Sequence, residues 1–346
     1  MRTTGLDLQS VNSILLVELN HFGDVVHALP AAQAFKKALP HARVSMLVEH
    51  PNRGLVALEP LVDRILEADG TRTVGGLLRT IRRIRHERYD LVCSFSPIRR
   101  NAWLALAAGG RYTAGYLHVW RKTPPYLRRT PVSARGFSLA GEAEYGFEHM
   151  GNASLKVCSA LGIPVEKGKL QVIPVPTKGD LIPRNSYIVF HPFAGWKFRE
   201  WPDHLVREFL LLCLRSTDLS IVIVGDTSEE ARVRDLTGGP ENEGRVLVRI
   251  GLPPAQLASL IEHAAAFVGT DSGPYQLCAL LGKPAVGLFG PNSPQISGSE
   301  VEESRAVYHK LDCSPCAQKR CVRPEAPCMA LITPEEVLEN MKRLLR

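Results

Sequence analysis

The sequence has no apolar run long enough to cross a membrane. The stretch 14–19 is short and contains Glu18, and the stretch 102–110 is about half of the roughly 20 residues that a membrane-spanning helix needs. The N-terminus carries one early Arg and an early Asp7, which makes it a poor signal peptide. We therefore expect a cytoplasmic protein.

Three motifs that commonly bind phosphates, dinucleotides or metal ions are also missing. The sequence has no Walker phosphate-binding loop, no Gly-x-Gly-x-x-Gly after its first expected strand, and no Asp-x-Asp pair for a divalent ion. These absences argue against P-loop nucleotide hydrolysis and against NAD or FAD chemistry. The net charge of +7 fits either a solvated basic surface or an anionic partner, and the charge alone does not choose between them. The basic residues lack interleaved aromatic side chains and form no nucleic-acid motif, so we expect no nucleic-acid partner.

The sequence does contain a repeated alternation of strand and helix patterns. Short stretches rich in apolar residues, typical of strands in a parallel sheet covered on both faces, lie at 14–19, 44–48, 91–95, 187–190, 220–224, 246–250, 266–268 and 285–289. Helical spacing of apolar residues occurs at 25–38, 74–86, 98–108, 142–162, 203–214, 254–264, 273–281 and 334–345. This alternation predicts an α/β protein with doubly wound parallel sheets.

The length of 346 residues and a proline-containing stretch over 173–186 predict two domains. We place the first domain at 1–175 and the second at 185–330. A last helix, within 331–346, has Thr333 as its cap and Pro334 as its first residue. Ligands of such sheets bind at the carboxyl ends of the strands, so the loops that follow strands are where site residues are expected.

One such loop in the second half has the features of an anion site. In "FVGTDSGPYQLCALLGKPAVGLFGP" (267–291), Asp271, Ser272 and Gly273 precede a helix. The free N–H groups and the dipole of that helix attract an anion, and a glycine lets the anion approach closely. The alternative is an ordinary capped helix, because Asp and Ser are common caps.

Two further loops bring charged groups to the same edge. "HPFAGWKFREWP" (191–202) contains Lys197 and Arg199, and "GDTSEE" (225–230) contains Glu229. Cations can neutralise phosphates, and a carboxylate can accept hydrogen bonds from ribose hydroxyls. The three loops together therefore suit a nucleotide diphosphate.

The first half contains a single carboxylate in a suggestive position. In "NHFGDVVHALPAA" (20–32), Asp24 follows Gly23 at the start of an expected helix. Asp24 either caps this helix and does nothing else, or acts as a base that faces a ligand. His21 and His27 flank it as polar neighbours.

Taken in order, "GDVVHALPAAQAFKKALPHARVSMLVE" (23–49), the Arg-x-Trp-Pro segment (199–202), "DSGPYQLCALLGKPAVGLFGP" (271–291) and the cysteine-containing C-terminal segment resemble glycosyltransferase family nine, the lipopolysaccharide heptosyltransferases. The resemblance covers nearly the whole chain. It implies a GT-B fold, in which two Rossmann-like domains face a central cleft. It also implies that the C-terminal helix, within 331–346, packs back on the N-terminal domain.

The resemblance also implies a reaction. The second domain would bind ADP-heptose and the first the inner core of lipopolysaccharide, with inversion at the anomeric carbon and without a metal or other cofactor. By position in the motifs, Asp24 would be the general base, Arg199 would bind phosphate, and Glu229 would bind ribose. Asp271, Ser272 and Gly273 would form the loop at the diphosphate, and Lys197 would add a donor-binding cation.

Two residues depart from the family pattern. Arg199 stands where the family usually has Lys, which keeps the charge but gives a planar fork instead of a point charge. Gln276 stands where the family usually has His. These departures keep other functions open: transfer of another nucleotide-activated sugar onto a surface polysaccharide, a GT-B nucleotide-sugar epimerase, or a non-catalytic carbohydrate-binding protein.

Basic residues of the first half are candidates for the acceptor side. Arg99 and Arg100 follow the expected strand 91–95 and could bind the acceptor. Arginines and a lysine over 121–129 could meet anionic acceptor groups or lipids of the inner membrane, on whose cytoplasmic face the protein would then bind peripherally. A solvated loop is the alternative.

Four cysteines are bunched near the C-terminus in a Cys-x2-Cys-x4-Cys-x6-Cys arrangement: Cys313, Cys316, Cys321 and Cys328. This spacing is compact enough for a structural zinc or iron site with four thiolate ligands. Free thiols or disulfides are the alternatives, and disulfides are rare in a reducing cytoplasm.

Overall fold

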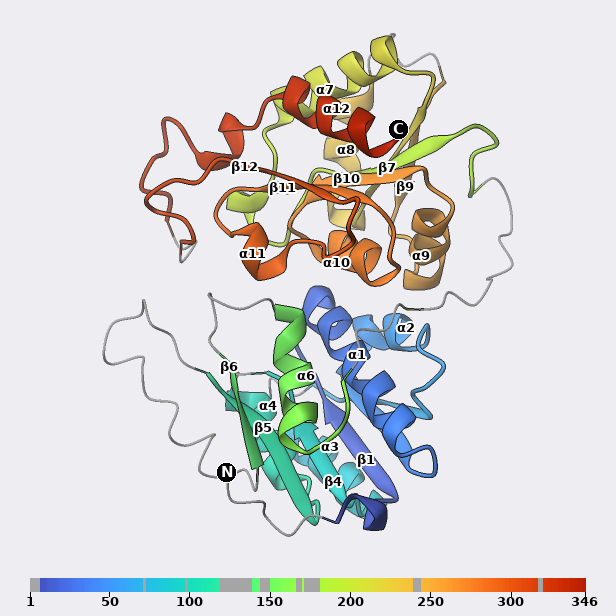
Figure 1. Ribbon diagram of the computed structural model, residues 1–346, viewed down its shortest axis with the longest axis vertical. Coiled ribbons are helices and arrows are strands. Elements are labelled where there is room, and N and C mark those ends of the chain that lie inside the picture. The colour runs from blue at the N-terminus through green and yellow to red at the C-terminus, as the bar shows by residue number, and fades with distance from the viewer. Residues whose placement is uncertain are drawn as a thin grey trace. The chain divides into compact units, whose positions relative to one another are not determined.

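The computed structural model describes residues 7–70, 73–96, 99–118, 139–143, 150–165, 170, 181–238, 244–316 and 320–346. The chain forms two compact units, Met1–Lys169 and Leu170–Arg346, which Figure 1 draws with the sequence coloured from blue to red. The division lies close to the proline-containing stretch expected as a linker, part of which lies outside the described residues. None of the described helices is long and apolar enough to span a membrane.

The first unit is built on a six-stranded sheet with the order β3-β2-β1-β4-β5-β6. Its strands are β1 (Ser13–Val17), β2 (Arg43–Glu49), β3 (Arg64–Ala68), β4 (Leu91–Ser94), β5 (Tyr112–His118) and β6 (Leu139–Ala143). All neighbouring pairs are parallel, and Leu15 of β1 lies in register with Ser45 of β2 and Val92 of β4. The central strands β1, β2 and β4 are largely buried and mostly apolar, as expected where helices cover both faces of the sheet.

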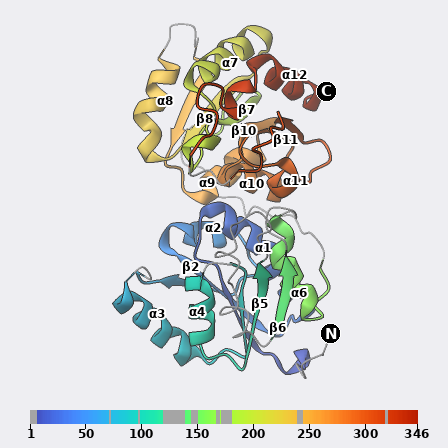
Figure 2. The ribbon, with the colours of Figure 1, turned by 90° about the vertical axis from the view of Figure 1, so that its left-hand side faces the viewer.

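The helices of the first unit are α1 (Phe22–Ala38), α2 (Arg53–Val56), α3 (Val74–Glu87), α4 (Arg99–Ala107) and α6 (Met150–Ala160). α1 packs against α6, and α3 packs against α4. Figure 2 shows the two pairs on opposite sides of the sheet. The start of α3 illustrates how the sequence sets these ends: the Thr73 hydroxyl accepts a hydrogen bond from the Gly76 N–H at 3.2 Å.

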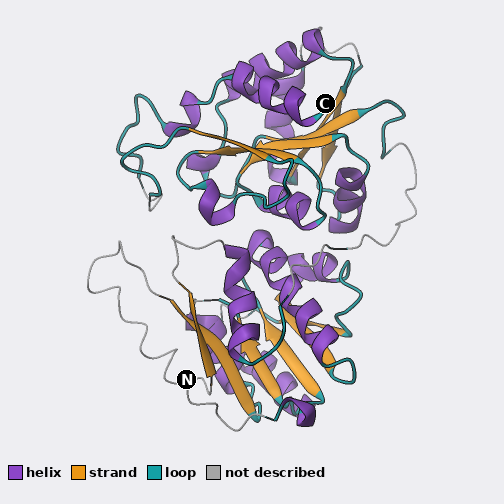
Figure 3. Cartoon of the chain, in the orientation of Figure 1, coloured by secondary structure: helices purple, strands orange, loops and turns teal. Residues whose placement is uncertain are grey.

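The second unit repeats the design with the strand order β12-β11-β10-β7-β8-β9, again parallel throughout. Its strands are β7 (Tyr187–His191), β8 (Ser220–Gly225), β9 (Val246–Ile250), β10 (Ala266–Thr270), β11 (Ala285–Phe289) and β12 (Arg305–Tyr308). Its helices are α7 (Asp203–Ser216), α8 (Glu230–Thr237), α9 (Pro254–Glu262), α10 (Gly273–Leu280), α11 (Pro294–Ser297) and α12 (Pro334–Leu344). Figure 3 shows the alternation of strands and helices along the chain.

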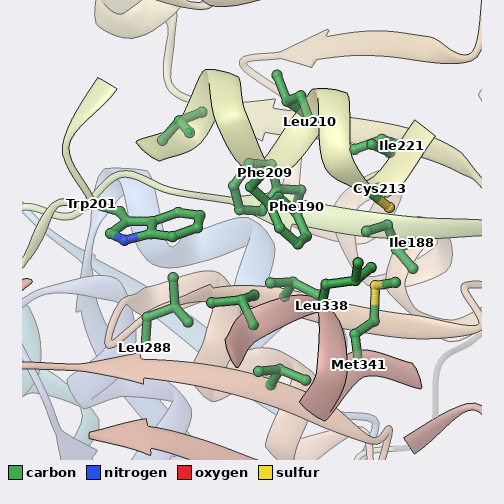
Figure 4. Close-up of a cluster of buried hydrophobic side chains, with 14 of the residues drawn as sticks. Ile188, Phe190, Trp201, Phe209, Leu210, Cys213, Ile221, Leu288, Leu338 and Met341 are labelled. Atoms are coloured by element: carbon green, nitrogen blue, oxygen red, sulfur yellow. The ribbon is translucent and has the colours of Figure 1, made fainter. Parts of the chain in front are cut away.

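The core of the second unit joins β7, α7 and α12. Phe190 and Trp201 both pack against Phe209, with centroid distances to its ring of 5.0 and 5.7 Å. Leu338 and Met341 of α12 belong to the same buried cluster, and Figure 4 draws them beside Ile188 and Leu288. The buried face of α12 therefore lies in the second unit, packed on α7 and the sheet, where the resemblance implied packing on the first.

The strands with largely apolar runs were predicted to within a few residues, whereas β3, β5, β6 and β12 were not predicted at all. The helix expected over 142–162 begins later, because β6 ends at Ala143 and α6 starts at Met150.

Candidate functional site

The two strands at the centre of the second sheet, β7 and β10, lie side by side although 74 residues separate His191 from Ala266 in the sequence. The chain leaves β7 toward β8 and returns to the other side through β10, which makes this pair the switch point of the sheet, the usual ligand site of such folds. Close approach needs Gly269, because a Cβ there would stand 2.6 Å from the His191 carbonyl oxygen.

Asp271 follows β10 at the switch point and is almost fully buried, with 5% of its surface exposed. Its Oδ1 accepts from the Ser297 hydroxyl at 3.0 Å and from the Gln276 amide at 3.3 Å. Its Oδ2 accepts from the Asn292 amide at 2.9 Å and lies 3.2 Å from Arg199 Nη1. A charge buried to this degree is stable only when it is paired and hydrogen-bonded, and Asp271 is both.

The cation that pairs with Asp271 stands on the loop after β7. Arg199 ends a short 3-10 turn (Lys197–Arg199), and its guanidinium lies over the Trp196 ring at 5.1 Å from the centroid. It is half-buried, with 28% of its side chain exposed. Lys197, the other candidate cation, is exposed. The structure thus places Arg199 beside the Asp271 loop.

Ser272 and Gly273 begin α10 directly after Asp271. Ser272 is the cap residue of this helix, yet its side chain makes no cap hydrogen bond. Its hydroxyl instead lies 3.0 Å from Nδ1 of His191, the last residue of β7. Burial lowers the pKa of His191 to about 4, so this imidazole is neutral at physiological pH.

Glu229 occupies the loop after β8. Its carboxylate accepts a hydrogen bond from the Asp226 N–H at 2.7 Å, and burial raises its pKa. Gly225 makes room for this arrangement, because a Cβ there would stand 2.9 Å from Glu229 Oε2. Glu229 is partly exposed at the carboxyl edge of the sheet.

In the first unit, Asp24 lies in the first turn of α1, after the carboxyl end of β1. Its Oδ2 accepts a hydrogen bond from the His21 N–H at 3.2 Å, so the side chain does cap the helix. Asp24 remains partly exposed, so capping does not withdraw it from solvent. The two interpretations of Asp24 therefore do not exclude each other.

Arg100 turns toward the sheet of the first unit. It donates to the Leu19 carbonyl at 2.7 Å and pairs with Glu49 at 3.2 Å, at the carboxyl ends of β1 and β2. The neighbouring Glu18 is buried, and burial together with the charge of Asp24 raises its pKa well above the usual value. The side chain of Arg99 and the whole 121–129 segment lie outside the described residues.

The four clustered cysteines, Cys313, Cys316, Cys321 and Cys328, are free thiols. Within the described part of the chain, no group of three or more His, Cys, Asp or Glu side chains is arranged to hold a metal ion. The structural zinc or iron expected from the spacing is therefore not supported. The segment that contains these cysteines is hydrogen-bonded to the loop after β11. Ser314 Oγ donates to the Gly290 carbonyl, and the Cys316 N–H donates to the Pro291 carbonyl.

Comparison with known families identifies this pair of α/β units. The family model described as glycosyltransferase family 9 (heptosyltransferase) matches residues 77–326. The chain belongs to this family. It is therefore a glycosyl-transfer enzyme, and the epimerase and non-catalytic alternatives are set aside.

Individual relatives agree with this assignment. Lipopolysaccharide heptosyltransferase 1 of Pseudomonas aeruginosa is 26% identical over 96% of this chain and 98% of that protein. Among solved structures, E. coli ADP-heptose LPS heptosyltransferase II has a TM-score of 0.77 at 18% identity, over 96% of this chain and 98% of that one. E. coli heptosyltransferase WaaC with ADP has a TM-score of 0.72 at 18% identity, over 96% and 99%. The fold class is thus the GT-B fold that was predicted.

Sequence reasoning missed three residues of the second-unit site: His191, Asn292 and Ser297. His191 ends an expected strand and Asn292 closely follows another, so the rule that sites lie at carboxyl ends applied to both. Ser297 lies on the short helix α11 and carried no comparable signal, because only the folded loop brings it to Asp271.

Proposed function

We propose that this protein transfers a heptose from ADP-heptose to the inner core of lipopolysaccharide. Membership of family 9 supports sugar transfer, and the names of the similar proteins support this donor and acceptor. The observation that carries the proposal is Arg199, a half-buried cation held beside the Asp271 loop at the switch point of the second sheet.

The second unit binds the donor in this proposal. Arg199 and the N–H groups at the start of α10 face the diphosphate, and Lys197 adds a second cation from the same loop. Glu229, at the edge formed by the loop after β8, accepts hydrogen bonds from the ribose hydroxyls. The cations take the place of a divalent ion, for which the sequence has no Asp-x-Asp pair.

Asp24 acts as the general base on the acceptor. The acceptor hydroxyl oxygen attacks the anomeric carbon from the side opposite the diphosphate and forms the new C–O bond. The bond from the anomeric carbon to the diphosphate oxygen breaks, and ADP leaves with the electron pair. Asp24 takes the hydroxyl proton, and the configuration at the anomeric carbon is inverted.

The first unit binds the acceptor. Arg99 and Arg100 are the proposed contacts, although Arg100 already holds the Leu19 carbonyl and Glu49 and must keep these bonds or exchange them. Because the acceptor is anchored in lipid, we also propose peripheral contact with the inner membrane through basic residues.

The direct test is to incubate the protein with ADP-heptose and a truncated lipopolysaccharide core in excess EDTA, and to identify the product by mass and linkage. Transfer of one heptose with inverted configuration is expected. Parallel reactions with other nucleotide sugars test the second candidate, another donor, which the exchange of the family's usual His for Gln276 keeps open. Transfer only from UDP- or GDP-sugars would overturn the proposed donor, and activity that returns only with magnesium would overturn the metal-free step.

A further inference from the structure

The carboxylate of Asp271 is held by a connected set of donors from a distant part of the chain. Asn292 Nδ2 donates to Asp271 Oδ2 at 2.9 Å and to Ser297 Oγ at 2.7 Å. The Ser297 hydroxyl, having accepted that bond, donates its own proton to Asp271 Oδ1 at 3.0 Å. Ser297 and Asn292 are 1% and 8% exposed, so water does not compete for these bonds.

The number of these bonds limits what Asp271 itself can do. An ionised carboxylate accepts about four hydrogen bonds. Asn292, Ser297 and the Gln276 amide supply three of them, and the Arg199 guanidinium forms an ion pair with the carboxylate at 3.2 Å. Both oxygens of Asp271 are thus engaged by neighbouring side chains, and of these partners Arg199 is the one that carries the positive charge a phosphate attracts.

Arg199 is a long side chain that needs such a support. Both Arg and Lys carry considerable rotamer entropy, which is lost on binding unless the side chain is already ordered. The Trp196 ring lies under its guanidinium and the fixed carboxylate of Asp271 lies beside it. A guanidinium has several N–H donors in a planar fork, so it can pair with a carboxylate on one edge and with a phosphate on another.

We propose that Asn292 and Ser297 are positioning residues: they fix the Asp271 carboxylate, which in turn orients Arg199 toward the diphosphate of the donor. This inference rests on the proposed function of the site. It assigns a role to the loop after β11, whose Asn292 donates to the Asp271 carboxylate. It also explains how Arg199 can replace the lysine that the family usually has. The planar guanidinium must be oriented to bind a phosphate, whereas the ammonium group of lysine can bind from several directions.

The test is a double-mutant cycle between Ser297 and Arg199. Calorimetry measures the affinity of each variant for ADP, for inorganic pyrophosphate and for adenosine. Ser297→Ala in the wild type should weaken the binding of ADP and pyrophosphate about fivefold to tenfold, in line with loss of an ordered charge-assisted contact. Adenosine, which has no phosphate, should bind with less than about twofold change. Ser259→Ala, the same exchange at a buried serine of α9, is the matched control and should change none of the three affinities.

The cycle is completed with Arg199→Ala. In the Arg199→Ala background, Ser297→Ala should change the ADP affinity by less than about twofold. Ser297 affects ADP binding only by orienting the Arg199 guanidinium, which this background lacks. Asn292→Ala should behave as Ser297→Ala does in both backgrounds, which guards against a local packing defect in one variant. An equal loss of ADP affinity with and without Arg199, or no loss in the wild type, would overturn the positioning role.

Failure of the proposed donor looks different. A wild type that binds pyrophosphate but not ADP would refute the nucleotide and leave the cycle readable with pyrophosphate. A wild type that binds neither would overturn both the donor site and the positioning role.

Discussion

His191 and Ser272 are joined across the switch point of the second sheet, with imidazole Nδ1 and hydroxyl Oγ 3.0 Å apart. His191 is the last residue of β7, and its imidazole ring lies edge-on to the Phe193 ring, with centroids 5.9 Å apart. The bond takes the Ser272 hydroxyl away from the N-terminus of α10, where a cap serine usually binds the helix N–H groups. Those N–H groups are therefore not covered by their own cap.

The first prediction is that His191 makes the protein less stable in acid. Burial lowers the pKa of His191 to about 4, whereas in the unfolded chain it is about 6.5. Between these values the unfolded state binds a proton that the folded state does not, so stability falls as the pH is lowered from 6.5 to 4. The wild type should lose about 2 kcal/mol more than His191→Asn between pH 7 and pH 4.5, measured by urea unfolding.

Burial also raises the pKa values of the carboxyl groups of Glu18 and Glu59, so these groups add their own pH dependence to the stability. They contribute equally to both proteins, so the difference between wild type and variant isolates His191. Parallel losses in the two proteins would mean that the ring is protonated in the folded state.

The second prediction concerns Asp24. If it is the general base, Asp24→Asn should lower kcat by roughly 10²–10⁴-fold. Asn still caps a helix, so the melting temperature should stay near that of the wild type, whereas Asp24→Ala should lose about 1 kcal/mol of stability as well. Turnover and melting temperature of the three proteins, measured side by side, separate the two roles.

Asp7 offers a matched control, because its carboxylate also caps a helical turn, accepting from the Gln9 N–H at 3.0 Å. Asp7→Asn should leave kcat unchanged. Near-normal turnover in Asp24→Asn would remove Asp24 from catalysis and direct the search for a base to His21 or His27.

The third prediction tests the loop after β8. Gly225→Ala places a methyl group 2.9 Å from the present position of Glu229 Oε2, so the carboxylate must move. If Glu229 binds ribose, this variant and Glu229→Gln should both raise the dissociation constant of ADP, and both should leave that of pyrophosphate unchanged. Gly75→Ala, at an exposed helical position where the nearest heavy atom is 3.6 Å from the added Cβ, is the control. Unaltered ADP affinity in Gly225→Ala and Glu229→Gln would place the ribose elsewhere.

The fourth prediction concerns α12. Met341 is fully buried in the core of the second unit, so Met341→Ala should cost about 2–5 kcal/mol of stability. Amide hydrogen exchange should speed up in α7, on which α12 packs. Glu339→Ala, at an exposed position of the same helix, should change neither. Faster exchange confined to α1 and α6 would contradict the packing described here.

The sequence alone was sufficient for the fold class because the central strands are buried on both faces. Largely apolar stretches such as 44–48 and 285–289, repeated in alternation with helical patterns, are typical of strands in the middle of a covered parallel sheet. Three of the missed strands, β3, β6 and β12, lie at sheet edges. Edge strands are partly exposed, as Arg305–Tyr308 illustrates, so their apolar pattern is broken and periodicity does not reveal them.

The sequence singles out candidate site residues where a charged side chain stands just after an expected strand or at the start of an expected helix. Asp24, Arg199 and Glu229 are charged residues that follow expected strands or begin helices, and a local pattern is enough to single them out. Their family resemblance rests on motifs that are likewise short and continuous in the sequence. What each binds is a proposal that awaits the measurements above.

The distant partners of Asp271 and Ser272 were decided only by the tertiary structure. The bond between His191 and Ser272 spans 81 residues, and the bond between Ser297 and Asp271 spans 26. The sequence of α12 shows an apolar face but does not say which surface that face covers. In the structure the face packs into the core that contains Phe209 of α7. An amino-acid pattern shows which face of a helix or strand is apolar and which side chains are charged. The residues that pack on that face or pair with those charges depend on which strands and loops the fold brings together.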